Sequence, residues 1–177
     1  MSTAGSPAEQ VNAAPSRPPE QACFDPSSAC AVIVTFEPDP GLLRRVVRSV
    51  VSQTGQVIVF DNGSQRVDVA GQLAGSERTR VLASPVNIGL AAALNRACDH
   101  ALAAGFEHVL LMDQDSVLAD GMVSTLGAAL VDLQRSGQVA AVGPQFRDAR
   151  SGSLAPFVRF GFPLNHKLRG GPGQRVS

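Results

Sequence analysis

The stretch VLLMDQDSV, residues 109–117, points both to a fold and to a site. Four apolar residues run into Asp113 and Asp115, and a short apolar run of this kind is typical of a buried strand. The two acids therefore follow the carboxyl end of a strand, which is where open parallel sheets bind ligands. If the extended conformation continues as far as Asp115, both carboxylates face one cavity and Gln114 points away from it.

Two carboxylates that face one site repel each other unless a cation lies beside them. Hard divalent ions such as Mg²⁺ and Mn²⁺ bind carboxylate oxygens, and substrate phosphates often complete their coordination shell. A simpler alternative is that one aspartate caps the following helix and the other is only solvated. For an isolated pair of acids this alternative is the more common one, so the rest of the chain has to decide between them.

Size and composition restrict the class of protein. The 177 residues suffice for one domain, and contents of 44% hydrophobic and 17% charged residues are typical of a globular protein. Fifteen basic and fifteen acidic residues cancel, and Trp and Tyr are absent, so we expect no nucleic-acid partner. The three cysteines form no CxxC pair and the three histidines have no zinc-ligand spacing. No membrane-spanning run or signal-peptide pattern is found, which favours a cytoplasmic location.

Strands and helices are expected to alternate along the middle of the chain. Strands are predicted at residues 31–36, 57–60, 80–83, 108–112 and 139–142. Helices are predicted after Asp39 and Pro40, after Gly89, and from residue 122 to residue 133, with a weak helix or loop at 67–74. The helix after Gly89 is expected to bury Leu90, Leu94, Ala97, Cys98, Ala101 and Leu102. This alternation predicts an α/β protein with a doubly wound, Rossmann-like and mostly parallel sheet.

The two ends of the chain have a different character. Residues 1–28 are rich in Pro, Ser and Ala and are expected to form a disordered leader. Beyond the fifth predicted strand the pattern weakens, with a further strand considered at 157–162 and a flexible tail at 170–177. The ordered domain is therefore expected to begin near Cys30.

Short polar side chains follow each of the first four predicted strands. They are Thr35 and Glu37, Asp61 and Asn62, Asn87, and Asp113 and Asp115. Each has a local explanation, since DNG is a turn sequence and an asparagine often caps a helix. Because the carboxyl ends of parallel strands meet at one edge of a sheet, these residues together predict a polar ligand pocket. No GxGxxG or GxxxxGK[ST] loop is present, so a phosphorylated ligand would need a metal and backbone N–H groups to balance its charge.

Four segments in this order carry a family resemblance: AVIVTF at 31–36, VIVFDNGS at 57–64, NIGLAAALNRA at 87–97 and VLLMDQDS at 109–116. The combination resembles the nucleotide-sugar half of family 2 glycosyltransferases with the GT-A fold, and the bacterial rhamnosyltransferase branch in particular. The similarity covers roughly residues 30–145. It implies a metal-dependent transfer of a sugar, with inversion, from a nucleoside-diphosphate sugar to a saccharide or lipid-linked acceptor.

The resemblance also implies roles for individual residues. Thr35, Phe36 and Glu37 would border the nucleotide, and Asp61 would hydrogen-bond the pyrimidine base with Asn62 beside it. Asn87 and Gly89 would shape a loop against the ribose and diphosphate, and Asn95 would lie on the next helix. Asp113 would contact the ribose, with Gln114 among the nucleotide-binding residues. The implied metal ligands for Mg²⁺ or Mn²⁺ are Asp115 and Asp113.

The implied donor is dTDP-L-rhamnose, with UDP-sugars as the second choice. Family members often work at the inner face of the cytoplasmic membrane, so a peripheral membrane association or a partner chain is a further expectation. The sequence itself contains no residue that identifies the acceptor.

The resemblance stops short of a complete enzyme. Inverting transfer needs a general base to accept the proton of the acceptor hydroxyl, and in the family this carboxylate comes from a half that follows the fifth strand. The last acid of this chain is Asp148, which lies too early, so no catalytic residue is assigned. We expect residues 29–150 to form the nucleotide-sugar-binding half and 151–177 an irregular tail in place of the acceptor half. The chain looks truncated, and such an incomplete sheet would expose apolar surface.

Three other classes of protein remain as alternatives. The first is a non-catalytic nucleotide-binding or partner protein built from the donor half alone. The second is a haloacid-dehalogenase-type phosphohydrolase with Asp113 as nucleophile and Asp115 as acid/base. It would need this motif on an early strand, a later lysine and a further acidic pair, whereas Lys167 is the single lysine. The third, a receiver-like domain, is disfavoured because no acid pair follows the first strand and no lysine follows the fifth.

Overall fold

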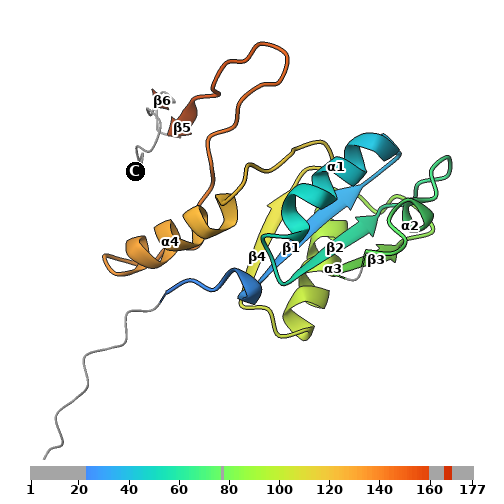
Figure 1. Ribbon diagram of the computed structural model, residues 1–177, viewed down its shortest axis with the longest axis horizontal. Helices are drawn as coiled ribbons and strands as arrows, with labels where there is room; N and C mark the ends of the chain where they lie inside the picture. The colour runs from blue at the N-terminus through green and yellow to red at the C-terminus, as the bar shows by residue number, and fades with distance from the viewer. Residues whose placement is uncertain (1–22, 77, 160–165, 169–177) are drawn as a thin grey trace, which may run out of the picture.

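A computed structural model describes residues 23–76, 78–159 and 166–168. Its central sheet has four parallel strands, β1 (Ala29–Thr35), β2 (Gln56–Asp61), β3 (Thr79–Ala83) and β4 (His108–Met112), in the order β3-β2-β1-β4. The helices are α1 (Pro40–Val51), α2 (Val69–Gln72), α3 (Leu90–Ala103) and α4 (Met122–Gln134), preceded by the 3-10 turn η1 (Pro26–Ser28) (Figure 1). The predicted α/β class with a parallel sheet is confirmed.

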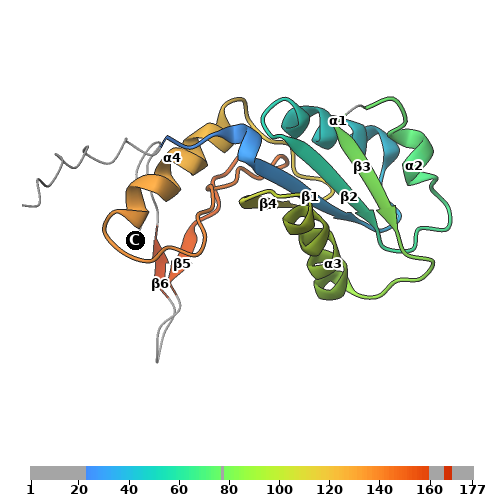
Figure 2. The ribbon, with the colours of Figure 1, turned by 90° about the horizontal axis from the view of Figure 1, so that it is seen from below.

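Helices cover both faces of the sheet, α1 and α2 on one side and α3 on the other (Figure 2). Alternate residues of the strands enter two separate apolar layers, as the two-residue period of a strand requires. Ile33 and Val59 pack with α1 and α2, whereas Val32 and Ile58 pack with α3. β1 and β2 are therefore buried on both faces, and this packing fixes the position and direction of their carboxyl ends, which carry the site.

Helix α1 follows directly from its sequence. Asp39 is the N-cap, its Oδ1 accepting the backbone N–H of Leu42 at 2.7 Å, and Pro40 occupies the first helical turn. Four apolar residues at helical spacing, Leu43, Val46, Val47 and Val50, are buried against the sheet. The arginines of this helix lie on its other side, as the pattern predicts.

Helix α3 has the predicted bounds but a different buried face. The residues that it buries completely are Ala93, Ala97 and Ala101, whereas Leu90 and Leu102 are each 61% exposed. Leu94 is half-buried at the margin of the same layer. The expectation that Leu90 and Leu102 line the core is thus wrong. Three alanines four residues apart let the helix backbone approach the sheet closely, and this stripe of small residues decides the orientation.

The region beyond β4 differs most from the expectation. Residues 139–142, which the structure describes, form no strand, so the predicted fifth strand is wrong and β4 is an outer strand of the sheet. Instead this segment lines a cavity of about 290 Å³ together with β4 and α4. An apolar run of four residues does not show whether a neighbouring strand is available for pairing.

The ends of the described chain contain local structure. Asp25 caps η1 by accepting the backbone N–H of Ser27, and the ring of Phe24 lies against α4 and 5.1 Å from the ring of His108. Residues 23–28, which the sequence assigns to the leader, thus have defined contacts. Within residues 151–177, β5 (Phe157–Arg159) pairs antiparallel with β6 (His166–Leu168). The remainder of the strand considered at 157–162 and the tail at 170–177 lie outside the described residues.

In the part of the chain that the structure describes, no helix is long and apolar enough to cross a bilayer.

Candidate functional site

The carboxyl ends of the strands bring the predicted polar residues to one edge of the sheet. The strand register aligns Thr35 of β1 with Asp61 of β2, and Asp61 with Ala83 of β3. These three positions form a row on the face covered by α1 and α2, because they alternate in phase with Ile33, Val59 and Val81. The row places Asp61 between two strands at the rim of the fold.

Thr35 lies beneath the surface of this row. Its side chain is fully buried, and its Oγ1 has no hydrogen-bond partner within the described residues. Its backbone carbonyl accepts the N–H of Asn62 at 2.8 Å, which ties the end of β1 to the start of the next loop. Thr35 therefore supports the site from below, and it is Phe36, 47% exposed, that reaches the surface.

Asp61 is nearly buried, with 9% of its surface exposed. Its Oδ1 accepts the backbone N–H of Ser64 at 3.0 Å, which closes the turn that the sequence DNGS predicts. Gly63 makes this turn possible, because its φ is +89° and a Cβ here would lie 2.5 Å from the backbone of Val86. The Oδ2 of Asp61 accepts no hydrogen bond from the described residues, so this oxygen can accept one from a ligand.

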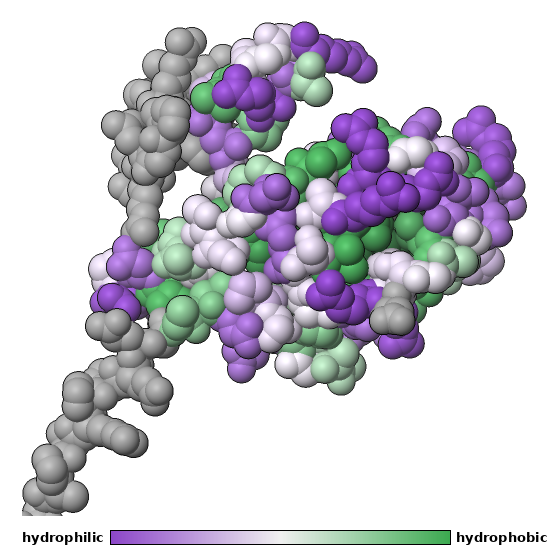
Figure 3. Space-filling view, viewed as in Figure 1, coloured by the Kyte–Doolittle hydropathy of each residue, from purple (hydrophilic) through white to green (hydrophobic). Residues whose placement is uncertain are grey.

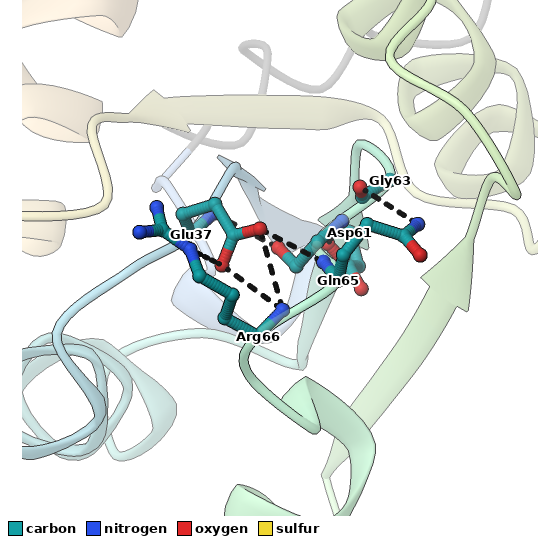
Figure 4. Close-up of polar contacts among 6 residues, drawn as sticks. Glu37, Asp61, Gly63, Gln65 and Arg66 are labelled. Carbon is teal, nitrogen blue, oxygen red and sulfur yellow. Dashed lines mark hydrogen bonds and ion pairs between the residues drawn. The ribbon is translucent and has the colours of Figure 1, made fainter.

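Glu37 is occupied in holding this turn in place. Its carboxylate accepts the backbone N–H of Gln65 at 2.9 Å and that of Arg66 at 3.3 Å, and it pairs with the Arg66 guanidinium at 3.4 Å (Figure 4). Its own backbone N–H donates to Ser64 Oγ at 2.9 Å. The Gln65 N–H first, and then the N–H and charge of Arg66, hold the pKa of Glu37 below its ordinary value. Glu37 also has a φ of +46°, an uncommon conformation for a residue with a side chain.

Asn62 and Asn87 join the loops after β2 and β3. The Oδ1 of Asn62, which is buried, accepts the backbone N–H of Ile88 at 2.9 Å, and its Nδ2 donates to Asn87 Oδ1 at 3.1 Å. The same Asn87 oxygen accepts the N–H of Gly89 at 2.9 Å, and Gly89 is the N-cap of α3 with no side-chain cap of its own. Both asparagines therefore order the loop that the family resemblance predicts to lie against the ribose and diphosphate.

The DQDS segment is a turn and not a continuation of β4. The strand ends at Met112, and the backbone N–H of Ser116 donates to the carbonyl of Asp113. Asp113 and Asp115 are both exposed, while the side chain of Gln114 reaches β1, where its Oε1 accepts the Phe36 N–H at 2.9 Å. The extended geometry considered for these residues is thus wrong, and the orientation of the two acids is set by a turn that Gln114 anchors.

Together these contacts connect all four loops at this edge. Gln114 joins the β4 loop to the β1 loop, Glu37 joins the β1 loop to the β2 loop, and Asn62 joins the β2 loop to the β3 loop. In each case a side-chain oxygen satisfies backbone N–H groups of the neighbouring loop. The sequence identified these side chains as ligand contacts, and it gave no sign of the pairing between them. Ser64 and Arg66, which complete the set, were not singled out by the sequence; only their position next to Asp61 could have indicated them.

An open cavity of about 520 Å³ adjoins Asp61. Its lining combines polar residues, namely Asp61, Ser64, Gln65, Arg66 and Asp68, with the apolar residues Val67, Val69, Ala70, Val81 and Ala83. A flat heterocycle with polar edges suits such a pocket, because its ring can contact the apolar side while its edge reaches the carboxylate. Asn95, in contrast, is exposed on α3 and is not among the residues that line this cavity.

The donor set after β4 fits a hard cation only in combination with a ligand. Asp113 and Asp115 are the two acids of the turn, and no group of three or more His, Cys, Asp or Glu that could hold a metal is found among the described residues. Mg²⁺ and Mn²⁺ typically take one or two carboxylates and fill the remaining positions with phosphate oxygens and water. The residues present match this requirement, and they do not form a closed protein cage.

Asp148 does not have the properties of a general base. Its Oδ1 accepts the backbone N–H groups of Arg150 and Ser151 at 2.7 and 2.8 Å. The Ser151 N–H, followed by that of Arg150, holds the pKa of Asp148 below its ordinary value. An acid engaged in its own turn and easily ionised is a poor proton acceptor at neutral pH.

Comparison with known proteins identifies the family of this chain and agrees with its fold. The family described as glycosyl transferase family 2 matches residues 30–171 of the chain. The chain belongs to this family. Its sheet has the GT-A-like arrangement that the resemblance implied, and membership leaves no support for the phosphohydrolase and receiver-like alternatives.

One curated relative is the dTDP-rhamnosyl transferase RfbF of Shigella flexneri, with 29% identity over 100 residues. The match covers 56% of this chain and 33% of that protein, so the chain spans about one third of the relative's length. The likeness to rhamnosyltransferases drawn from the motifs is supported by this second comparison.

Proposed function

We propose that this chain is the donor-binding part of a glycosyltransferase, which binds a pyrimidine nucleoside-diphosphate sugar at the carboxyl edge of its sheet. The observation that carries the proposal is the placement of Asp61 beside a half-apolar cavity, with Asp113 and Asp115 exposed on a turn after β4 at the same edge. One carboxylate is available to the base and two are available to a metal–diphosphate. This is the combination that a nucleoside diphosphate requires.

In this proposal the base enters the cavity, where Asp61 Oδ2 accepts a hydrogen bond from a ring N–H and Val67, Val81 and Ala83 contact the ring. Asp115 and Asp113 hold Mg²⁺ or Mn²⁺ against the diphosphate. When bound, the metal supplies Lewis-acid stabilisation of the charge on the departing nucleoside diphosphate.

We propose dTDP-L-rhamnose as donor, since the curated relative carries that nucleotide in its name. Transfer would proceed with inversion, the acceptor hydroxyl of a saccharide or lipid-linked saccharide attacking the anomeric carbon opposite the leaving diphosphate. We assign no residue of this chain as the base that takes the proton of that hydroxyl. Because Asp148 is unsuited to this role, a second candidate function is nucleotide binding without catalysis, with a partner chain or membrane surface supplying the acceptor side.

Calorimetric titration with dTDP and UDP, with and without Mn²⁺, tests the donor site. We expect binding that Mn²⁺ strengthens, and a loss of this strengthening by at least about tenfold in Asp115→Ala, which removes a charged ligand. Asp120→Ala is the matched control, because Asp120 is an exposed acid of the same connection between β4 and α4. A folded chain that binds neither nucleotide would contradict the donor site, and equal binding with and without Mn²⁺ would contradict the metal ligands.

The two candidate functions are separated by turnover. Incubation of the chain with dTDP-rhamnose and Mn²⁺, followed by measurement of dTDP release with and without saccharide acceptors, distinguishes an enzyme from a binding protein. Release that depends on an acceptor supports transfer. Tight binding without any release supports the non-catalytic alternative.

A further inference from the structure

The residue at the centre of the site network is Glu37, and its contacts differ from those of a ligand-binding acid. Its side chain is 13% exposed, and its two oxygens are engaged by the backbone N–H groups of Gln65 and Arg66 and by the Arg66 guanidinium. Its backbone N–H is bonded to Ser64 Oγ. Every hydrogen bond and ion pair of Glu37 among the described residues is thus made to residues 64–66, which follow Asp61, Asn62 and Gly63.

These three residues determine the orientation of Asp61. The Ser64 N–H is the hydrogen bond that fixes Asp61 Oδ1, so the position of Ser64 sets the direction of the free Oδ2. Residues 65 and 66 are both exposed, and within the turn Gln65 has one further hydrogen bond, from its Nε2 to the Gly63 carbonyl at 3.3 Å. Their backbone N–H groups are ordered by the Glu37 carboxylate, and a hydrogen bond to a charged acceptor is stronger than one between neutral groups.

We infer that Glu37 is a positioning residue: it holds residues 64–66 so that Asp61 presents its free oxygen to the nucleobase, and it makes no contact with the nucleotide itself. This inference rests on the proposed function and assigns to Glu37 a part different from the nucleotide contact that the sequence predicted. The backbone of Glu37 supports it, because a φ of +46° costs free energy for a residue with a side chain and persists where surrounding contacts hold it. The four polar contacts to residues 64–66 provide that hold.

A double-mutant cycle with dTDP as the ligand tests this inference. Glu37→Gln keeps the length of the side chain but offers one accepting oxygen in place of two, so we expect the Kd for dTDP to rise about tenfold. Asp61→Asn should raise the Kd as well, since it removes the charged acceptor. If Glu37 acts through Asp61, adding Glu37→Gln to Asp61→Asn changes the Kd by less than about twofold. Independent, multiplicative effects of the two substitutions would overturn the inference.

A ligand without a base provides a readout that general destabilisation would not reproduce. Mn²⁺ with inorganic pyrophosphate engages only the metal side, so we expect Glu37→Gln to leave its affinity unchanged while dTDP affinity falls. Equal losses for both ligands would contradict a positioning role. Glu107→Gln is the matched control, because it makes the same chemical change at an exposed glutamate before the amino end of β4 and should alter neither affinity.

Glu37→Asn guards against misfolding, since asparagine tolerates a positive φ and its short side chain cannot reach both N–H groups. We expect it to fold and to show the same selective loss of dTDP binding. Failure of both variants to fold would contradict a role confined to positioning. If the wild-type chain binds pyrophosphate with Mn²⁺ but no nucleotide, the proposed function and this inference both fail, whereas normal wild-type dTDP binding with a multiplicative cycle overturns the inference alone.

Discussion

Helices α1 and α4 are nearly equal in length, yet they are held in very different ways. Helix α1 buries four apolar side chains against β1 and β2, each at most 3% exposed. Helix α4 is the more apolar in sequence but buries only Val123 and Gly127, and green, hydrophobic surface is visible over its region in Figure 3. The difference lies in the sheet below, because α1 covers inner strands and α4 lies beside the outer strand β4 and a cavity of about 290 Å³.

The comparison shows that hydrophobic content does not by itself produce burial. Helix α4 is held near its first residues by Gln53, which lies in the loop between α1 and β2. The Gln53 side chain accepts the Val123 N–H and donates to the Ala119 carbonyl. Farther along, Gly127 of the helix lies against the ring of Phe24, and residues 139–142 line a cavity together with the helix; neither Phe24 nor this segment belongs to the sheet. Substitutions on the α1 side of the molecule, including the site loops, are therefore expected to lower the free energy of unfolding more than substitutions on the α4 side.

The largest effect is expected for Gly63→Ala in the site turn. A side chain at a φ of +89° costs about 1–2 kcal/mol, and the backbone of Val86 and Asn87 within 3 Å of the new Cβ adds about 1–3 kcal/mol. Urea unfolding measures the loss, and dTDP titration should show loss of binding. Gly75→Ala is the matched control, since Gly75 has a φ of +86° with nothing within 4 Å of a Cβ. Equal losses of stability in the two variants would show that the close approach at Gly63 is unimportant.

A pair of leucine truncations compares the two helices directly. Leu43→Ala in α1 empties a fully buried position and should lower the free energy of unfolding by about 3 kcal/mol. Leu130→Ala in α4 affects a half-buried position and should cost about 1 kcal/mol. Chemical denaturation of both variants measures the difference. Similar losses would mean that α4 is packed as firmly as α1, contrary to the structure.

The strand positions were predictable because an apolar β-branched run bounded by turn residues leaves few other choices. The four parallel strands begin and end within about two residues of the predicted positions, and Asp39 caps α1 as its sequence indicates. The predictions that failed concern relations between segments. Leu and Ala on α3 compete for the same face, and the sheet selects the alanines because they permit a closer approach.

The same reasoning explains what the sequence revealed of the site. It identified the polar residues of the strand ends, since topology alone brings these to one edge. The sequence did not predict that Glu37, Asn62 and Gln114 form hydrogen bonds to neighbouring loops. These contacts depend on the exact residue at which each strand ends, and a shift of one residue would change them. Gln114 turns toward β1 because β4 ends at Met112, and the strand period no longer applies beyond that point.

A third prediction concerns the contact between Gly127 of α4 and the ring of Phe24. A Cβ at Gly127 would lie 2.0 Å from the ring of Phe24, so Gly127→Ala must displace this ring and should cost about 1–2 kcal/mol. The obstacle is a side chain that can move, unlike the backbone at Gly63, which is why the expected cost is smaller. Adding Phe24→Ala should recover part of the loss, as measured by thermal unfolding of the two single variants and the double variant. No recovery would indicate that Phe24 does not pack on α4.

The smallest effect expected is a pH dependence that reports on β1 itself. Cys30 is fully buried in this strand, and burial raises the pKa of its thiol to about 11. The unfolded chain loses this proton first as the pH rises, so the folded state loses stability between about pH 9 and pH 11, and by pH 10 the loss is about 1.4 kcal/mol. The window is favourable because the chain has a single lysine and no tyrosine to titrate there. Cys30→Ala should reduce this loss, whereas Cys23→Ala, at an exposed cysteine, should leave it unchanged. Equal pH dependence in Cys30→Ala and the wild type would mean that the Cys30 thiol is accessible to water in the folded protein. The core around β1 would then be as loosely packed as the region around α4.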